Sequence, residues 1–228
     1  PHSCAISSSI QYLERTEPRE IDIKVDVIRI SKGSSTGRVT ILQDNNIKCI
    51  YTGLCSDFAH MKGYAGLATP IPELFNTTEK DSFISLDYEN IKPGFTPAFV
   101  KQVDCFVHPD HAWWDRDISN EDADARCSAY ISLQGGIPDQ YALSFFSDIL
   151  PPVVLNKYGP LGWVPTLTLT THIRQMPQTE VLLLDFIASD IHNGYFEQDC
   201  KIWDLNKNLV ASSRQLTRIL KSEEKITI

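Results

Sequence analysis

Residues 181–219, VLLLDFIASDIHNGYFEQDCKIWDLNKNLVASSRQLTRI, carry the pattern that decides the fold. This stretch reads as an apolar strand, a bend containing Ser or Gly, a second strand, a turn rich in Asp and Asn, and a third strand. Residues 21–57, IDIKVDVIRISKGSSTGRVTILQDNNIKCIYTGLCSD, follow the same rhythm, and a gap of a single residue aligns the two stretches. A repeated unit fixes an architecture before local propensity does, so we expect two related β-rich units in this chain.

The overall composition excludes several classes of protein. A chain of 228 residues with 42% hydrophobic content is long enough for one large domain or two fused small ones. Its formal net charge of −8 disfavours a general nucleic-acid surface. Every apolar run is shorter than the roughly 18–20 residues that a membrane span needs. We therefore expect no nucleic-acid partner, no membrane span and an intracellular location, cytoplasmic or organellar. A peroxisome stays open, although no C-terminal signal for it is visible.

The cysteine and histidine content suggests neither a disulfide scaffold nor a metal site. Six cysteines are sparse for a chain of this length, and no CxxC pair is present. Reduced thiols in an intracellular protein fit this usage, whereas a secreted module would rest only on the even count and the sequon at Asn76. His108-Pro109-Asp110-His111 groups possible ligands but lacks a fourth one, so a plain loop is favoured. We expect no metal ion and no other cofactor.

The chain between the two β-rich units is less regular. Residues 59–124 hold several prolines and no sustained hydrophobic period, so we interpret them as an irregular connection. Residues 135–154, GGIPDQYALSFFSDILPPVV, then predict a buried helix. Pro138 suits its first turn, and Pro151 stops it.

Two strand patterns predict which side chains share a face. Residues 21–27 alternate between apolar and charged side chains, which is typical of a half-buried strand. A further strand at 163–173 follows the helix. Simple alternation places Thr166, Thr168 and Thr170 on one face of that strand.

The second half therefore reads as a strand, a buried helix and four strands, an order typical of the hotdog fold. Its motifs resemble those of the acyl-CoA thioesterase II-like (thioesterase-like) superfamily, whose members fuse two hotdogs in one chain. The motifs that carry the resemblance are QGG at 134–136, FSD at 146–148, PTLTLTTH at 165–172, WD at 203–204 and LVASSRQ at 209–215. The resemblance implies an α+β double hotdog, in which antiparallel sheets each wrap a central helix.

The same resemblance suggests three parts: an incomplete N-terminal hotdog at 1–58, the irregular connection at 59–124 and a C-terminal hotdog at 125–228. Family members usually carry a strand and a helix ahead of the segment with which this sequence begins. A sheet without its helix would expose apolar surface at a cost of about 25 cal/mol per Å². We therefore expect the chain to be incomplete, with the first hotdog helix missing from it, or to need a partner on this face.

The resemblance also implies a site that activates water. In the family, a helix carboxylate, a strand hydroxyl and a late glutamine hold a water against a thioester carbonyl. Matching the motifs gives Asp148, Thr166 and Gln215. Burial among apolar side chains would raise the pKa of Asp148 and suit it to act as a general base. Thr166 and Gln215 would orient the water. The implied reaction is hydrolysis of an acyl thioester, with acyl-CoA as the partner.

The substrate is expected to lie between the helix and the sheet. Backbone N–H groups near Gly135 and Gly136 are candidate donors to the carbonyl oxygen. The acyl chain would lie near Tyr141, Phe145 and Trp163. No GxSxG motif is present, which disfavours a serine hydrolase.

Each catalytic candidate also has an ordinary structural explanation. Asp148 could be solvated at the helix end, Thr166 could be one of several strand threonines, and Gln215 could lie at the surface. Cys55 stands in the first unit where Gln215 stands in the second, so we expect at most one active site per chain. The alternative function is a non-catalytic hotdog protein that binds an acyl ligand or serves as an assembly subunit. Hotdog pairing predicts a homo-oligomer in either case.

Overall fold

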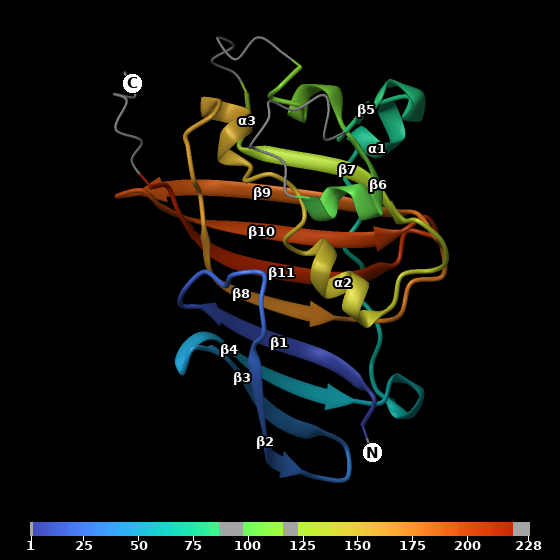
Figure 1. Cartoon of the computed structure of the whole chain (residues 1–228). Coiled ribbons are helices and arrows are strands. Elements are labelled where there is room, and N and C mark those ends of the chain that lie inside the picture. The colour runs from blue at the N-terminus through green and yellow to red at the C-terminus, as the bar shows by residue number, and fades with distance from the viewer. Residues whose placement is uncertain (1, 87–97, 116–122, 221–228) are drawn as a thin grey trace.

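The computed structural model describes residues 2–86, 98–115 and 123–220. Within these ranges the strands form one continuous 11-stranded sheet in the order β2-β3-β4-β1-β8-β11-β10-β9-β7-β6-β5 (Figure 1). Every neighbouring pair is antiparallel. The strands are β1 (Cys4–Tyr12), β2 (Asp22–Ile30), β3 (Ser35–Gln43), β4 (Asn46–Ser56), β5 (Ile84–Ser85), β6 (Val103–Val107), β7 (Arg126–Leu133), β8 (Thr166–Ile173), β9 (Leu182–His192), β10 (Tyr195–Asp204) and β11 (Leu209–Arg218).

The two halves of the sheet are connected in the same way. The first half runs β2-β3-β4-β1, and the second runs β9-β10-β11-β8, so each has its first strand beside its fourth. The halves meet where β1 pairs with β8, and Ile10 lies opposite Leu169 there. Backbone hydrogen bonds therefore join the two predicted units into one sheet, and the double hotdog architecture is confirmed.

The described part of the chain also contains short helices. In the described part of the chain they are η1 (Phe58–His60), α1 (Leu74–Thr77), η2 (Lys80–Ser82), η3 (Ala98–Gln102), η4 (Pro109–His111), α2 (Gln140–Phe146) and α3 (Val154–Tyr158). Figure 1 shows α2 lying across one face of the sheet, in front of β11 and β8. None of these helices is long and apolar enough to cross a membrane.

Helix α2 is shorter than the sequence predicts. It starts after Asp139, whose carboxylate accepts hydrogen bonds from the Tyr141 and Ala142 N–H groups at 2.9 Å, so Pro138 lies outside the helix. It stops at Phe146, four residues ahead of the predicted end, because the chain tightens into an i→i−3 hydrogen bond at Asp148. This early end turns Asp148 away from the helix axis.

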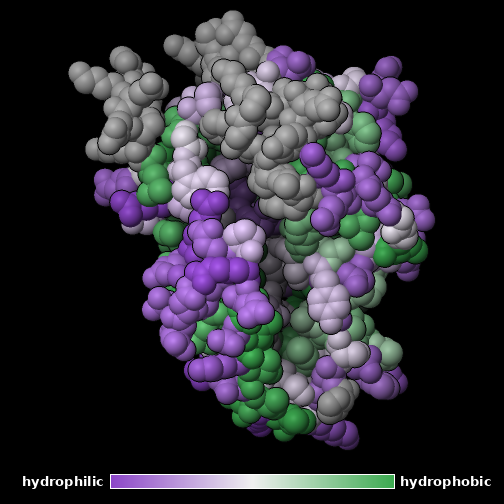
Figure 2. Space-filling view, viewed as in Figure 1, coloured by the Kyte–Doolittle hydropathy of each residue, from purple (hydrophilic) through white to green (hydrophobic). Residues whose placement is uncertain are grey.

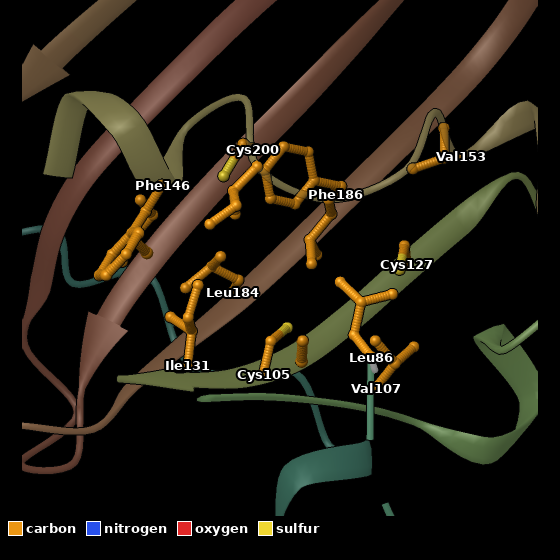
Figure 3. Close-up of a cluster of buried hydrophobic side chains, with 14 of the residues drawn as sticks. Leu86, Cys105, Val107, Cys127, Ile131, Phe146, Val153, Leu184, Phe186 and Cys200 are labelled. Atoms are coloured by element: carbon orange, nitrogen blue, oxygen red, sulfur yellow. The ribbon is translucent and has the colours of Figure 1, made fainter. Parts of the chain in front are cut away.

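The main hydrophobic core lies between α2, α3 and the inner face of β7–β11. Phe146, Leu184 and Phe186 are fully buried there, together with thiols of Cys127 and Cys200 (Figure 3). Because side chains alternate along a strand, the inner face of β9 is uniformly apolar while Asp185 points to the other side. This core holds α2 firmly against the second half of the sheet.

A second, smaller core covers the opposite face of the sheet. Phe75 and Phe83, from the connecting segment, stack at 6.1 Å between ring centroids and pack on Tyr130 of β7 and Trp203 of β10. The Trp203 indole N–H donates to the Thr69 carbonyl at 3.0 Å. The segment interpreted as an irregular connection therefore contributes a packed layer and, through β5 and β6, two strands of the sheet.

The inner face of the first half of the sheet is exposed along β2 and half-buried along β3 and β4. Strand β2 was expected to be half-buried, but Ile23, Val25 and Val27 have 59%, 65% and 66% of their surface exposed. Apolar side chains accordingly gather on the lower part of the face in Figure 2, where Figure 1 places β2 and β3. The prediction that this strand is half-buried is therefore wrong. Among the residues that the structure describes, no helix packs on β2.

Candidate active site

Asp148 lies in the turn that follows α2, at the junction of the helix and the sheet. The preceding residue, Ser147, is the C-cap of α2 and donates its hydroxyl proton to the Ser144 carbonyl at 2.7 Å. Thr171 of β8 therefore donates to Ser147 Oγ at 3.0 Å. Ser213 of β11 adds a bond to the Ser147 carbonyl at 3.4 Å. These contacts tie the turn to two strands and fix where Asp148 points.

Thr166 and Gln215 meet Asp148 on the inner face of the sheet. The Thr166 hydroxyl lies 3.2 Å from Asp148 Oδ1 and 2.8 Å from Gln215 Oε1. Gln215 is 3% exposed. The structure thus brings the three predicted catalytic side chains together, from the turn after α2, from β8 and from β11.

A β-bulge gives Thr166 this position. Gln215 pairs with Leu169, but two residues further along β11 Thr217 pairs with Thr166, so Leu167 is an extra residue in β8. The bulge reverses the alternation between Thr168 and Thr166. Thr166 therefore shares the inner face with Leu169, and the prediction that it shares a face with Thr168 is wrong.

The electrostatics of Asp148 suit a general base. Burial raises the pKa of its carboxyl from 3.8 to about 6, while hydrogen bonds from Thr166 and Gln215 act in the opposite direction. Desolvation dominates because it penalises the charged form more than two hydrogen bonds restore it. A carboxylate with a pKa near 6 is ionised at neutral pH, yet it holds a transferred proton better than a solvated one does.

The hydrogen bonds of the trio change with the charge of Asp148. The Thr166 hydroxyl has one proton and cannot donate to Asp148 and Gln215 at the same time. When Asp148 is protonated, it can donate to Thr166, which then donates to Gln215. When Asp148 is ionised, Thr166 can donate to it, and a rotated Gln215 amide can turn its NH₂ group inward. The trio can therefore accommodate both charge states of Asp148.

Asp148 opens into a pocket of about 180 Å³ beside α2. The pocket is lined by Ser8, Ile10, Tyr12, Tyr51, Ser144, Phe145, Asp148, Leu169 and Thr171. Most of its exposed lining comes from apolar atoms, and it lies at the junction of β1, β4, β8 and α2. Of the trio, Asp148 alone lines this pocket, so Thr166 and Gln215 support the carboxylate from behind.

The structure separates the predicted substrate-binding residues. Phe145 lines the pocket, whereas Tyr141 and Trp163 are 73% and 70% exposed and lie outside it. Gly135 and Gly136 have φ values of +112° and +85°, a conformation that glycine tolerates best. The Gly135 N–H donates to the Leu133 carbonyl at 2.8 Å, so this donor is already engaged.

Sequence reasoning missed the contribution of the first half. Ser8, Ile10 and Tyr12 of β1 line the pocket, and so does Tyr51 of β4, which hydrogen-bonds Ser8. The spacing of two between these β1 residues is a signal that could have found them, because it puts them on one face. That this face lies beside Asp148 depends on the pairing of β1 with β8.

The remaining candidates have structural roles. His108 Nδ1 accepts from the Asp110 N–H and its Nε2 bonds the Thr78 hydroxyl at 2.9 Å, while His111 Nδ1 accepts from the Ser128 N–H. Across the described ranges, no group of three or more His, Cys, Asp or Glu side chains could hold a metal ion. All six cysteines are free thiols.

Comparisons with known proteins place the chain in a family. The family model of the acyl-CoA thioesterase C-terminal domain matches residues 77–219, more than half of the chain. No curated protein matches the sequence.

Solved structures show the same fold. A protein provisionally described as a thioesterase II from Thermobifida fusca YX is 24% identical with a TM-score of 0.76, over 96% of this chain and 80% of that one. A hot dog fold protein of unknown function from Alicyclobacillus acidocaldarius is 17% identical with a TM-score of 0.79, over the same shares. An acyl-CoA thioesterase II from Mycobacterium marinum is 13% identical with a TM-score of 0.64, over 97% and 82%. The fold and the family match agree: the chain belongs to the family of the acyl-CoA thioesterase C-terminal domain.

Proposed function

We propose that this protein hydrolyses an acyl thioester of the acyl-CoA class, with Asp148 as the general base. The observation that carries the proposal is the desolvated Asp148 carboxylate, which opens into an apolar-walled pocket and is held from behind by Thr166 and Gln215. An ionisable group of perturbed pKa inside a pocket is a functional-site candidate on physical grounds. Family membership supports this reaction class.

The reaction follows from these positions. Ionised Asp148 takes a proton from a water molecule as the water oxygen bonds to the thioester carbonyl carbon. The carbonyl π electrons move to oxygen and give a tetrahedral intermediate. When the carbonyl reforms, the carbon–sulfur bond breaks, and the leaving thiolate takes the proton from Asp148. The products are a free acid and a thiol. Thr166 and Gln215 keep the carboxylate aimed into the pocket throughout.

A panel of acyl-CoAs of increasing chain length, assayed with a thiol-detecting reagent, tests this proposal. Wild type should turn over at least one substrate, and Asp148→Asn should lower kcat by roughly 100-fold or more while circular dichroism stays unchanged. Equal turnover by the two proteins would remove Asp148 from the mechanism. No turnover with any acyl-CoA would contradict the proposed activity.

A non-catalytic hotdog protein that binds an acyl ligand is the second candidate. It is favoured by the exposed side chains of Val25 and Val27, which lie on the same face of the sheet as the pocket residue Tyr51. Calorimetric binding of an acyl-CoA without release of thiol would support this alternative. We also infer that the two halves repeat one hotdog unit, since their strands connect alike, and that hotdog pairing makes the protein a homo-oligomer. Sedimentation analysis tests the oligomeric state.

A further inference from the structure

Tyr12 lies at the same level of the sheet as the catalytic trio. Ile10 of β1 pairs with Leu169 of β8, so both side chains are on the inner face. Tyr12 is the next inward residue of β1 after Ile10. On the neighbouring strand this level is the bulge at Leu167, where Thr166 turns inward. The strand register therefore places the Tyr12 phenol, from the first half of the chain, beside the site in the second half.

The Tyr12 hydroxyl is also close enough to the Asp148 carboxylate to be influenced by its charge. Both side chains line the same pocket, and Tyr12 remains 38% exposed. The pKa of Tyr12 is raised above its ordinary value, first by burial, then by the negative charge of Asp148, and then by Cys49. A phenol in this position keeps its proton throughout the range in which a carboxylate base works. It can therefore donate a hydrogen bond while Asp148 is ionised.

Tyr12 is also a donor without an engaged partner. Within residues 2–86, 98–115 and 123–220, no hydrogen bond involves its hydroxyl. Of the other candidate donors, Thr166 and Gln215 bond Asp148 and each other, the Gly135 N–H bonds the Leu133 carbonyl, and neither Gly135 nor Gly136 lines the pocket. Thioester hydrolysis needs a donor to the carbonyl oxygen, because negative charge develops there when water attacks.

We propose that the Tyr12 hydroxyl donates a hydrogen bond to the thioester carbonyl oxygen, so that a residue of the first half completes the active site of the second. The inference rests on the proposed function. As the water oxygen bonds to the carbonyl carbon, the π electrons move to the oxygen, and the Tyr12 hydroxyl stabilises the resulting charge without giving up its proton. In this one step, Asp148 acts on the water and Tyr12 acts on the carbonyl oxygen.

Four full-length proteins test the proposal: wild type, Asp148→Asn, Tyr12→Phe and Tyr195→Phe. Tyr195 is the matched control, because it is also 38% exposed and lies outside the pocket, at the start of β10. With a turned-over acyl-CoA, Tyr12→Phe should lower kcat by roughly 100-fold and change KM by less than about twofold. Tyr195→Phe should match wild type. The acid limb of the pH profile should stay in place in Tyr12→Phe, since Tyr12 makes no hydrogen bond to Asp148.

Infrared spectroscopy supplies a readout that a merely structural role would not move. In a ketone analogue of acyl-CoA, a CH₂ group replaces the thioester sulfur, so the bound carbonyl is stable. Its stretching frequency should be lowered in wild type and in Asp148→Asn, and should return upward in Tyr12→Phe. An unchanged kcat or an unchanged frequency in Tyr12→Phe would overturn the inference while the loss of activity in Asp148→Asn upholds the proposed function. A wild type that turns over no acyl-CoA would overturn both the inference and the proposed function.

Discussion

The Thr166 hydroxyl lies 2.8 Å from Gln215 Oε1, although simple alternation along β8 would put the two side chains on opposite faces of the sheet. One extra residue, Leu167, makes the contact possible because it shifts the register between β8 and β11. The same bulge brings Thr166 within hydrogen-bond distance of Asp148. The hydrogen bonding around Asp148 thus depends on a local irregularity in one strand.

The bulge predicts different effects for two threonines two residues apart. Thr166→Val removes a hydrogen bond to the base and should lower kcat/KM by roughly 10- to 100-fold, since a hydrogen bond to a charged group contributes about 1.5–3 kcal/mol. Thr168→Val changes a side chain on the outer face and is the matched control, with kcat/KM within about twofold of wild type. Steady-state measurement of kcat/KM for both variants tests this prediction. A comparable loss in Thr168→Val would contradict the assignment of faces.

The pH dependence of hydrolysis should follow the pKa of Asp148. Burial raises that pKa to about 6, and the base must be ionised to accept a proton from water. The kcat/KM of wild type should therefore be constant above this value and fall by about tenfold per pH unit well below it. The raised pKa of Tyr12 predicts no decrease on the alkaline side up to about pH 9. A profile with its acid limb near pH 4 would show that the base is a solvated carboxylate.

Asp148→Asn should stabilise the folded protein at neutral pH. The pKa of Asp148 is higher in the folded state than the ordinary value of 3.8, so folding favours the protonated form. The stability that this group contributes is complete below the unfolded pKa and is lost as the pH rises through about 6. The loss amounts to up to about 3 kcal/mol above that pH.

Urea unfolding measures this effect. The free energy of unfolding of Asp148→Asn should exceed that of wild type at about pH 8, and the difference should shrink towards about pH 4. Asp190→Asn, which removes an exposed carboxylate, controls for the change in net charge. A variant less stable than wild type at both pH values would mean that the hydrogen bonds to Asp148 outweigh its desolvation.

Gly53 should be required for the shape of the pocket. A Cβ at this position would lie 2.7 Å from Cε1 and 2.9 Å from Oη of Tyr51, so the phenol ring would have to move. Because Tyr51 lines the pocket and bonds Ser8, Gly53→Ala should raise KM by several-fold with a modest loss of stability, about 1 kcal/mol.

Gly37 provides the matched control for Gly53. The two glycines are cross-strand partners, but a Cβ at Gly37 would meet only the Asp26 carbonyl, at an ordinary 3.5 Å. Gly37→Ala should therefore leave KM unchanged in the same thiol-release assay. A similar KM for both variants and wild type would mean that Tyr51 does not shape the substrate site.

Several features of this protein could be predicted from its sequence because they depend on local order. The three strand patterns in 181–219, separated by a bend containing Ser or Gly and by an Asp/Asn turn, predict antiparallel hairpins that the structure contains. The apolar stretch before Pro151 predicts a buried helix, and α2 is that helix in shortened form. The double hotdog architecture is confirmed as well.

Other features could not be read from local patterns. The pairing of Phe75 and Phe83 with Trp203 joins residues far apart in the sequence, in a segment without hydrophobic period. The early end of α2 depends on Ser147, whose partners Thr171 and Ser213 come from two distant strands. Sequence periodicity therefore describes single elements well and their mutual contacts poorly.

The sequence by itself determined the strand rhythm and the buried helix, because these follow from the order of neighbouring side chains. The trio of Asp148, Thr166 and Gln215 was implied by the resemblance of its motifs to those of a family. The tertiary structure alone decided that Thr166 rather than Thr168 faces Asp148, since one bulged residue reverses the alternation. It also decided that Tyr12 lies beside the site, since that depends on the register between β1 and β8. Register is set by packing across the whole sheet, and no short stretch of sequence contains it.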